Sequence, residues 1–145
     1  MANGDMTSEI NISGTDDSGN AYALSKSLVT SACTRVAKWR TPVPISTDSI
    51  ILTISGTITG NAFASVTKAV FVNNGPTYDI VIGFTDTGAE SAYFAIPVND
   101  FFVLNSAEFE TNATGGAYSG FATIDVVTAQ ALTAICDLDV IIYHV

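Results

Sequence analysis

From residue 48 onward the sequence alternates between apolar and polar residues with a period of two. The clearest runs are 50–58, 78–84 and 137–142, where Ile, Leu, Val and Phe alternate with Thr, Ser, Gly and Asp. Alternation over about four to eight residues places one face of a strand on a core and the other toward water. Gly, Asn, Asp and Pro separate the runs, and strands spaced in this way predict a sandwich or barrel rather than βαβ units.

The predicted fold is therefore all-β: a two-sheet antiparallel β-sandwich, with a jelly-roll topology as one option, that carries an N-terminal arm. Two segments also fit helical spacing, residues 22–39 and 126–136, but the β-branched and Ser/Thr content of the first favours a strand. We expect strands near 8–13, 27–39, 49–58, 62–73, 77–84, 91–97, 101–110, 117–127 and 131–144.

The length of 145 residues is that of one ordinary domain. Residues 1–20 are rich in Gly, Asp, Ser and Asn and predict a polar arm, which leaves 21–145 for the sandwich. Residues 16–20, Asp-Asp-Ser-Gly-Asn, are only faintly similar to a calcium loop because the ligand spacing and the later Glu are missing. A turn within the arm is the better interpretation.

Charge is scarce in this chain and unevenly placed. Charged residues make up 13% of the sequence, against about 25% in a typical soluble domain, so a partner protein is expected to cover part of the surface. The net charge is −9, yet residues 26–40 hold four of the five Lys and Arg residues and no acid. This balance disfavours nucleic-acid binding. The basic segment either docks on the acidic face of a neighbour or is simply a solvated strand.

The sequence offers no constellation of catalytic residues, so we expect no enzyme activity and no cofactor or metal. A nucleophile–histidine pair would have to use His144, which is next to the last residue. Cys33 and Cys136 are far apart and predict two buried thiols, with a disulfide as the alternative. No apolar run reaches the ~18 residues of a membrane span, so we expect no contact with a membrane.

Aromatic residues suggest two kinds of surface. Phe101-Phe102-Val103-Leu104 presents apolar groups on both faces of its strand, which predicts burial on both sides, either by a second sheet or by another subunit. Exposure of Trp39, Tyr93 and Tyr118 together in a groove would instead favour a carbohydrate- or receptor-binding module, such as a fibre tip or adhesin domain. That module is the alternative function.

The segment from Lys68 to Leu104 resembles a pattern found in small bacteriophage virion proteins. Its parts are Ala69-Val70-Phe71-Val72-Asn73-Asn74-Gly75, Ile80-Val81-Ile82-Gly83, Tyr93-Phe94-Ala95-Ile96-Pro97 and Phe101-Phe102-Val103-Leu104. The stretches 34–36 and 40–45 are similar to the lead-in strands of such proteins. This chain departs from the pattern at Pro97-Val98-Asn99-Asp100, where a Pro-Gly turn is usual.

The resemblance implies a structural virion protein, with a capsid decoration (cement) protein as the expected role and neck, tail or fibre parts as related ones. It further implies the major capsid protein or other virion subunits as partners, location in the virion, and a homo-oligomer, a trimer being favoured. Low charge and the basic segment suggest which residues form the assembly interface: Asp5, Asp16, Asp17, Arg35, Lys38, Trp39, Arg40, Phe101 and Phe102.

Overall fold

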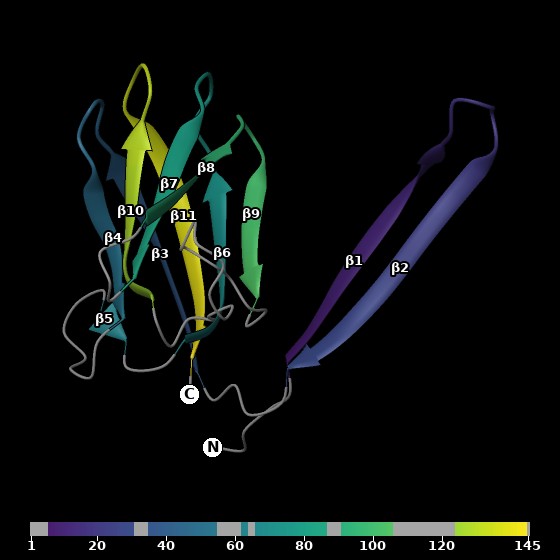
Figure 1. Ribbon diagram of the computed structural model, residues 1–145, viewed down its shortest axis with the longest axis horizontal. Coiled ribbons are helices and arrows are strands. Elements are labelled where there is room, and N and C mark those ends of the chain that lie inside the picture. Colours follow the sequence, from purple (N-terminus) through teal and green to yellow (C-terminus); the bar gives the residue numbers. More distant parts are fainter. Residues whose placement is uncertain are drawn as a thin grey trace. The chain divides into compact units, whose positions relative to one another are not determined.

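The computed structural model describes residues 6–30, 35–54, 62–63, 66–86, 91–105 and 124–144. The regular elements in these ranges are β-strands throughout, and none of the described residues belongs to a helix long and apolar enough to cross a membrane. The chain divides into two compact units, Met1–Thr34 and Arg35–Val145. Figure 1 shows the strands of both units.

The first unit is an antiparallel hairpin, which we call the arm. Strands β1 (Met6–Thr15) and β2 (Ala21–Thr30) pair from Met6 opposite Thr30 to Thr15 opposite Ala21. The strand predicted at 8–13 is thus present and longer. The structure places the end of the arm after Thr34 rather than after residue 20, because β2 pairs with β1 along its whole length.

The second unit is a sandwich of two sheets. One sheet has the order β3 (Arg35–Val43), β11 (Cys136–His144), β6 (Val66–Asn73) and β9 (Phe101–Asn105). The other has the order β5 (Ala62–Phe63), β4 (Ser49–Ile54), β10 (Ile124–Ala131), β7 (Ile80–Asp86) and β8 (Ser91–Ile96). All pairs are antiparallel except the two-residue parallel pairing of β4 with β5. The predicted fold class is confirmed.

Strand pairing in the sandwich is nested. Strand β3 pairs with β11, β4 with β10, β6 with β9, and β7 with β8. When the short β5 is set aside, the first strand of the sandwich thus pairs with its last strand, and the second with the last but one. Successive nested pairs lie alternately in the two sheets. This is the jelly-roll arrangement, which closes the core between two sheets.

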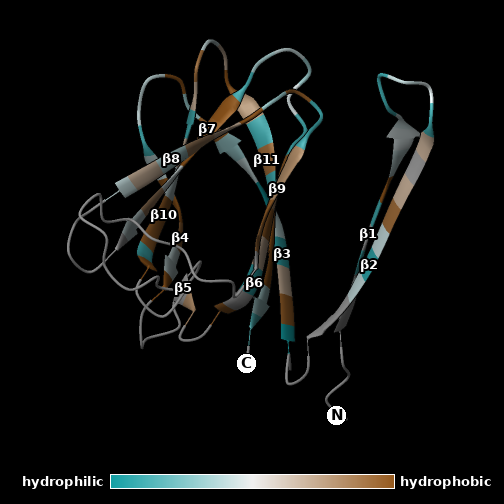
Figure 2. Ribbon diagram, turned by 45° about the vertical axis from the view of Figure 1, so that its right-hand side comes forward, coloured by the Kyte–Doolittle hydropathy of each residue, from teal (hydrophilic) through white to brown (hydrophobic). Residues whose placement is uncertain are grey.

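The core lies between the sheets and is built from the inward-facing residue of each alternating pair. On β11, for example, Leu138, Val140 and Ile142 are buried while the residues between them are not. Four Phe rings from four strands meet in the core. Phe71 contacts Phe84 edge-on with ring centroids 5.9 Å apart, and Phe94 stacks on Phe102 with ring centroids 5.0 Å apart. Figure 2 shows hydrophobic residues distributed along the strands of both sheets.

Several predicted strands differ from the observed ones in their ends. The strand expected at 27–39 is two strands, β2 and β3, and within the two ambiguous segments residues 22–30, 35–39 and 126–131 are strand. The last strand begins at Cys136 instead of 131, because residues 132–135 form the turn between β10 and β11. The strand ends expected at 55–58, 106–110 and 117–123 lie outside the described residues.

The four-ring cluster generates a stability prediction with a matched control. Phe71→Ala should lower the free energy of unfolding by about 3–5 kcal/mol, since Phe71 is fully buried and its removal leaves a cavity. Phe101→Ala removes the same side chain from a site that is 62% exposed and should cost less than about 1 kcal/mol. Urea denaturation of both variants measures the difference, and equal losses would contradict the assigned core.

Candidate functional site

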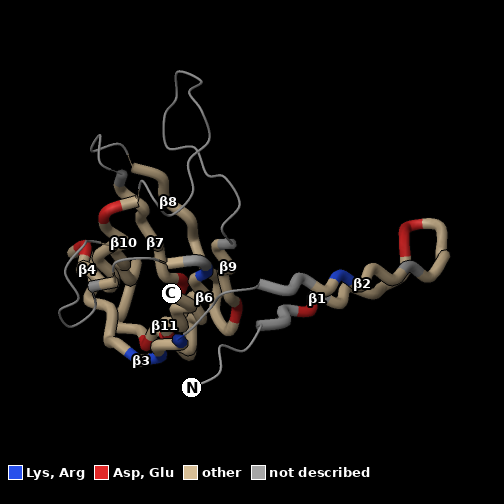
Figure 3. The backbone as a smooth tube through the Cα atoms, turned by 90° about the horizontal axis from the view of Figure 1, so that it is seen from below, with Lys and Arg blue, Asp and Glu red and all other residues tan. Residues whose placement is uncertain are grey.

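The predicted interface residues on β3 point to opposite faces of the strand. Lys38 is exposed on the outer face, whereas Trp39 is half-buried and packs against the core. Figure 3 shows the cationic positions on β3, an edge strand of its sheet. Charge on an edge strand opposes pairing with a further strand. Lys38 therefore places an exposed charge on this edge, which makes the edge a poor template for pairing.

Arg40 is engaged within its own sheet. Its guanidinium donates to both carboxylate oxygens of Asp139 on the adjacent strand, Nε to Oδ1 at 2.7 Å and Nη2 to Oδ2 at 3.0 Å. This hydrogen bonding holds the pKa of the Asp139 carboxyl below its ordinary value and raises the pKa of Arg40. A bidentate pair of this kind fixes both side chains, so Arg40 is less suited than Lys38 to binding a neighbour.

Trp39 contributes to a second aromatic group in the core. Its ring stacks on that of Phe63 with centroids 6.0 Å apart, and the centroids of the Phe63 ring and the His144 imidazole are 4.8 Å apart. The indole Nε1 is buried and has no hydrogen-bond partner among the described residues. His144 is itself buried and paired in a strand. Trp39 therefore acts in packing. Of the other two aromatic residues considered for a sugar platform, Tyr93 is exposed, and Tyr118 lies outside the described residues.

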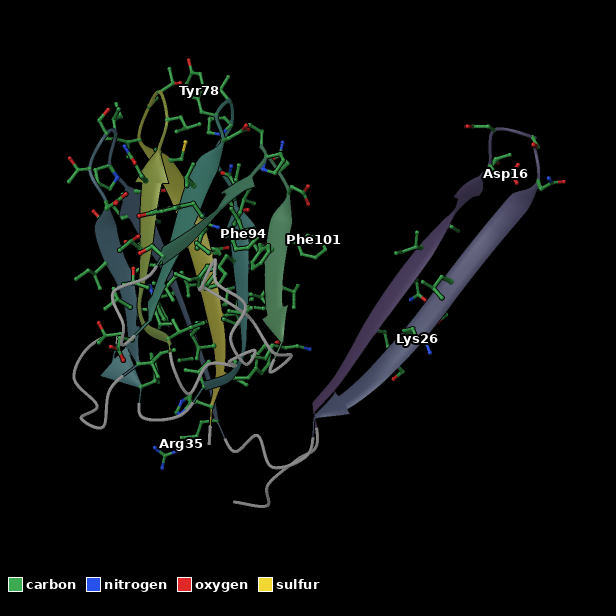
Figure 4. All side chains as sticks on the ribbon, viewed as in Figure 1. Asp16, Lys26, Arg35, Tyr78, Phe94 and Phe101 are labelled. Carbon is green, nitrogen blue, oxygen red and sulfur yellow. The ribbon has the colours of Figure 1, made fainter. Side chains whose placement is uncertain are left out.

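The two Phe residues at the start of β9 have different surroundings. Phe102 packs on the core against Phe94, while Phe101 is exposed on the outer face of the sheet. Figure 4 shows Phe101 pointing away from the sandwich. The second sheet therefore covers one face of the strand, whereas Phe101 leaves apolar surface exposed on the other face, which was predicted to be buried.

The arm ends in a turn that Asp16 organises. The Asp16 carboxylate accepts from the backbone N–H of Ser18 at 2.9 Å and of Asn20 at 2.8 Å, and Gly19 adopts a φ of 83°. These hydrogen bonds lower the pKa of Asp16, and the one from the Asn20 backbone has the largest effect. The turn interpretation of residues 16–20 is confirmed; Asp17 lies in the same turn, and Asp5 lies outside the described residues.

One face of the arm is apolar. Ile12 and Leu24 are directly opposite each other in the register, and both are about half exposed. Lys26 follows two residues after Leu24 and so shares its face of the strand. The hydrogen bond from Ser25 to Asn11, at 2.7 Å, lies on the opposite, polar face. A two-stranded ribbon has no second layer to cover its apolar face, and such a hairpin is only marginally stable alone in water.

At one end of the sandwich the loops 44–48, 74–79, 97–100 and 132–135 form a connected surface that we call the loop rim. The fully buried Asn73 organises it: its Nδ2 donates to the carbonyl oxygens of Tyr78, Ile96 and Pro97 at 2.9–3.1 Å, and its Oδ1 accepts from Gly75 N–H at 2.8 Å.

Backbone hydrogen bonds join the remaining loops of the rim. Ala131 N–H donates to Pro44 O at 2.9 Å, and Leu132 N–H donates to Asp79 O at 3.4 Å. Asn99 adopts a φ of 58°, a left-handed conformation that Asn tolerates in place of Gly. The rim is therefore held in one conformation by the strand ends beneath it.

The loop rim exposes four large apolar side chains: Ile45, Tyr78, Leu132 and Ile135. Of these, Ile135 is 65% and Leu132 is 54% exposed, although each sits in a short turn between buried strands. Alternation alone does not reveal this surface, because residues 132 and 135 fall within the strand predicted at 131–144. The signal that could have revealed it is the pair Leu132 and Ile135, two large apolar residues between the strand that ends at Ala131 and the strand that begins at Cys136.

The other residues considered for chemistry have structural surroundings. The free thiol of Cys136 is buried and donates weakly to the carbonyl oxygens of Ala134 and Tyr78, and burial raises its pKa. Cys33 lies outside the described residues. Within the described ranges, no three His, Cys, Asp or Glu side chains gather as a metal site requires.

Comparison with known proteins finds no protein family and no curated protein that matches the chain. Among solved structures, the chain is similar to one from a study titled "Bacillus endospore appendages form a novel family of disulfide-linked pili", with a TM-score of 0.40 and 12% identity. The match covers 100% of this chain and 95% of that chain. A likeness at this TM-score carries no information on function.

Asn73 provides the test of the loop rim. Asn73→Ala should lower the free energy of unfolding by about 2–4 kcal/mol, because buried carbonyl oxygens and the Gly75 N–H lose their partner. Thr133→Ala, at an exposed position of the rim, is the control and should cost less than about 1 kcal/mol. Thermal and urea unfolding measure both, and a harmless Asn73→Ala would refute its organising role.

Proposed function

We propose that this chain is a structural subunit that assembles with copies of itself and with neighbouring subunits of a larger particle. Its arm supplies the contact: an apolar ribbon face lies on a neighbour, and Lys26 and Lys38 pair with acidic groups there. Burial of roughly 800 Å² on each partner is enough for a specific, stable interface. No catalytic step is part of this function.

The observation that carries the proposal is the arm's unpartnered apolar face. Ile12 and Leu24 lie side by side on a ribbon that forms a compact unit of its own, with ten paired residues in each strand and no second layer within it. Keeping such a ribbon folded requires a surface that covers this face. A neighbouring subunit that does so gains apolar burial at about 25 cal/mol per Å².

The particle that we propose is a bacteriophage virion, in which the chain acts as a capsid decoration protein. This part rests on the sequence resemblance of residues 68–104, and the jelly-roll arrangement of the strands is compatible with it because viral capsid proteins use that arrangement widely. The exposed Phe101 adds apolar surface for contact with the capsid.

The alternative, a carbohydrate-binding module, has Tyr93 as its main support. The Tyr93 ring crosses Gly83, where a Cβ atom would lie 2.8 Å from the ring, and the side chain is 60% exposed. A sugar platform usually combines several aromatic groups, and Trp39 is packed on the core instead. Loss of glycan binding in Tyr93→Ala would favour this alternative.

The test replaces the arm's apolar pair in the full chain. Ile12→Ser with Leu24→Ser should weaken self-association and binding to empty capsids by about thirtyfold or more, as expected for removal of central interface anchors. Ser13→Ala with Ser27→Ala changes the opposite face and serves as the control. Light scattering and capsid pelleting measure both. Unaltered assembly in the first variant, or an unmodified chain that is monomeric and ignores capsids, would refute the proposal.

A further inference from the structure

The loop rim combines two properties that suit a protein contact. Four apolar side chains are exposed on it, and its loops also carry carboxylates at Asp48, Asp79 and Asp100, with Asp137 at the adjoining start of β11. None of the described rim residues is Lys or Arg. An apolar surface edged by acids calls for a partner that brings apolar groups together with a positive charge.

The chain itself offers few cations to meet these acids. Of its five Lys and Arg side chains, Lys68 is buried and Arg40 is bound to Asp139. The remaining three are exposed: Lys26, Arg35 and Lys38. All three lie on the arm or on the strand that follows it, and Lys26 shares its face with Leu24.

From this complementarity we propose that the loop rim is the acceptor for the arm of a second copy of this chain, with Lys26 beside the rim carboxylates and Ile12 and Leu24 on the rim's apolar residues. This inference rests on the proposed function and adds the partner surface to it. The arm brings an apolar pair and a cation together on one face, which is the combination that the rim requires.

The position of the rim within the sandwich sets the direction of the contact. The arm joins the sandwich at Arg35, which pairs with His144 at one end of β3, whereas the rim lies at the other end, where Val43 pairs with Cys136. Figure 4 shows Arg35 and Tyr78 at opposite ends of the sandwich. A contact between two different surfaces of identical copies is heterologous, so it builds a closed ring or an open filament.

The rigidity of the rim favours this contact. Asn73 and the backbone hydrogen bonds between the loops hold the acceptor in its bound form before the partner arrives. A preformed surface loses little conformational entropy on binding. The arm, in contrast, has no second layer of its own to cover its apolar face.

The test uses two full-length variants that should complement each other. The arm variant carries Ile12→Ser with Leu24→Ser, and the rim variant carries Leu132→Ser with Ile135→Ser. Each alone should sediment as a monomer. An equimolar mixture should form one-to-one dimers, because the rim variant brings an intact arm and the arm variant an intact rim. Ile50→Ser, at an exposed position outside the rim, is the matched control and should assemble normally.

Circular dichroism first verifies that each variant is folded, and the single change Ile135→Ser replaces the double rim variant if that one unfolds. Adding Lys26→Glu to the rim variant should reduce dimer formation in the mixture, most strongly at low salt. A rim variant that assembles normally would refute the rim as acceptor while leaving arm-mediated assembly intact. Two monomeric variants that do not combine would also refute it. A monomeric unmodified chain would instead refute the proposed function.

Discussion

Every second residue of a β-strand faces the same way, and a strand with an apolar face must place that face against another layer. The two sheets of the sandwich satisfy this requirement for each other: Leu138, Val140 and Ile142 on one sheet face Ile80, Ile82 and Phe84 on the other. The arm obeys the same constraint but contains only two strands. Its Ile12 and Leu24 therefore need a surface from outside the arm.

This constraint links the fold to the proposed function. Nested strand pairing gathers four loops at one end of the sandwich. Asn73 holds the loops 74–79 and 97–100 by side-chain hydrogen bonds, and backbone hydrogen bonds join the other two. The resulting rim is rigid, apolar and acidic. The arm carries an apolar pair and Lys26, and joins the sandwich at the opposite end. In the proposed assembly, the arm is the donor surface and the rim of a second copy is the acceptor surface.

The sequence predicted the class of fold but not its contacts. Period-two alternation predicts strands at 77–84 and 131–144, and the structure has them at Ile80–Asp86 and Cys136–His144. Alternation does not reveal pairing. It therefore predicts one strand over 27–39, although β2 pairs within the arm and β3 within the sandwich. Among the predicted interface residues, Lys38 and Phe101 are exposed, whereas Trp39 packs inward and Arg40 binds Asp139. The Asn-Asn-Gly-Pro run at 73–76 was recognised as a turn, but the triple donation by Asn73 depends on strands distant in sequence.

Hydrogen–deuterium exchange of the unmodified protein at several concentrations tests most directly whether a neighbour covers the arm. If assembly buries the arm, the amides of residues 6–30 should be protected at high concentration and lose protection on dilution, while the buried strands β6, β7 and β11 stay protected at every concentration. Arm amides whose exchange is the same at all concentrations would contradict the account.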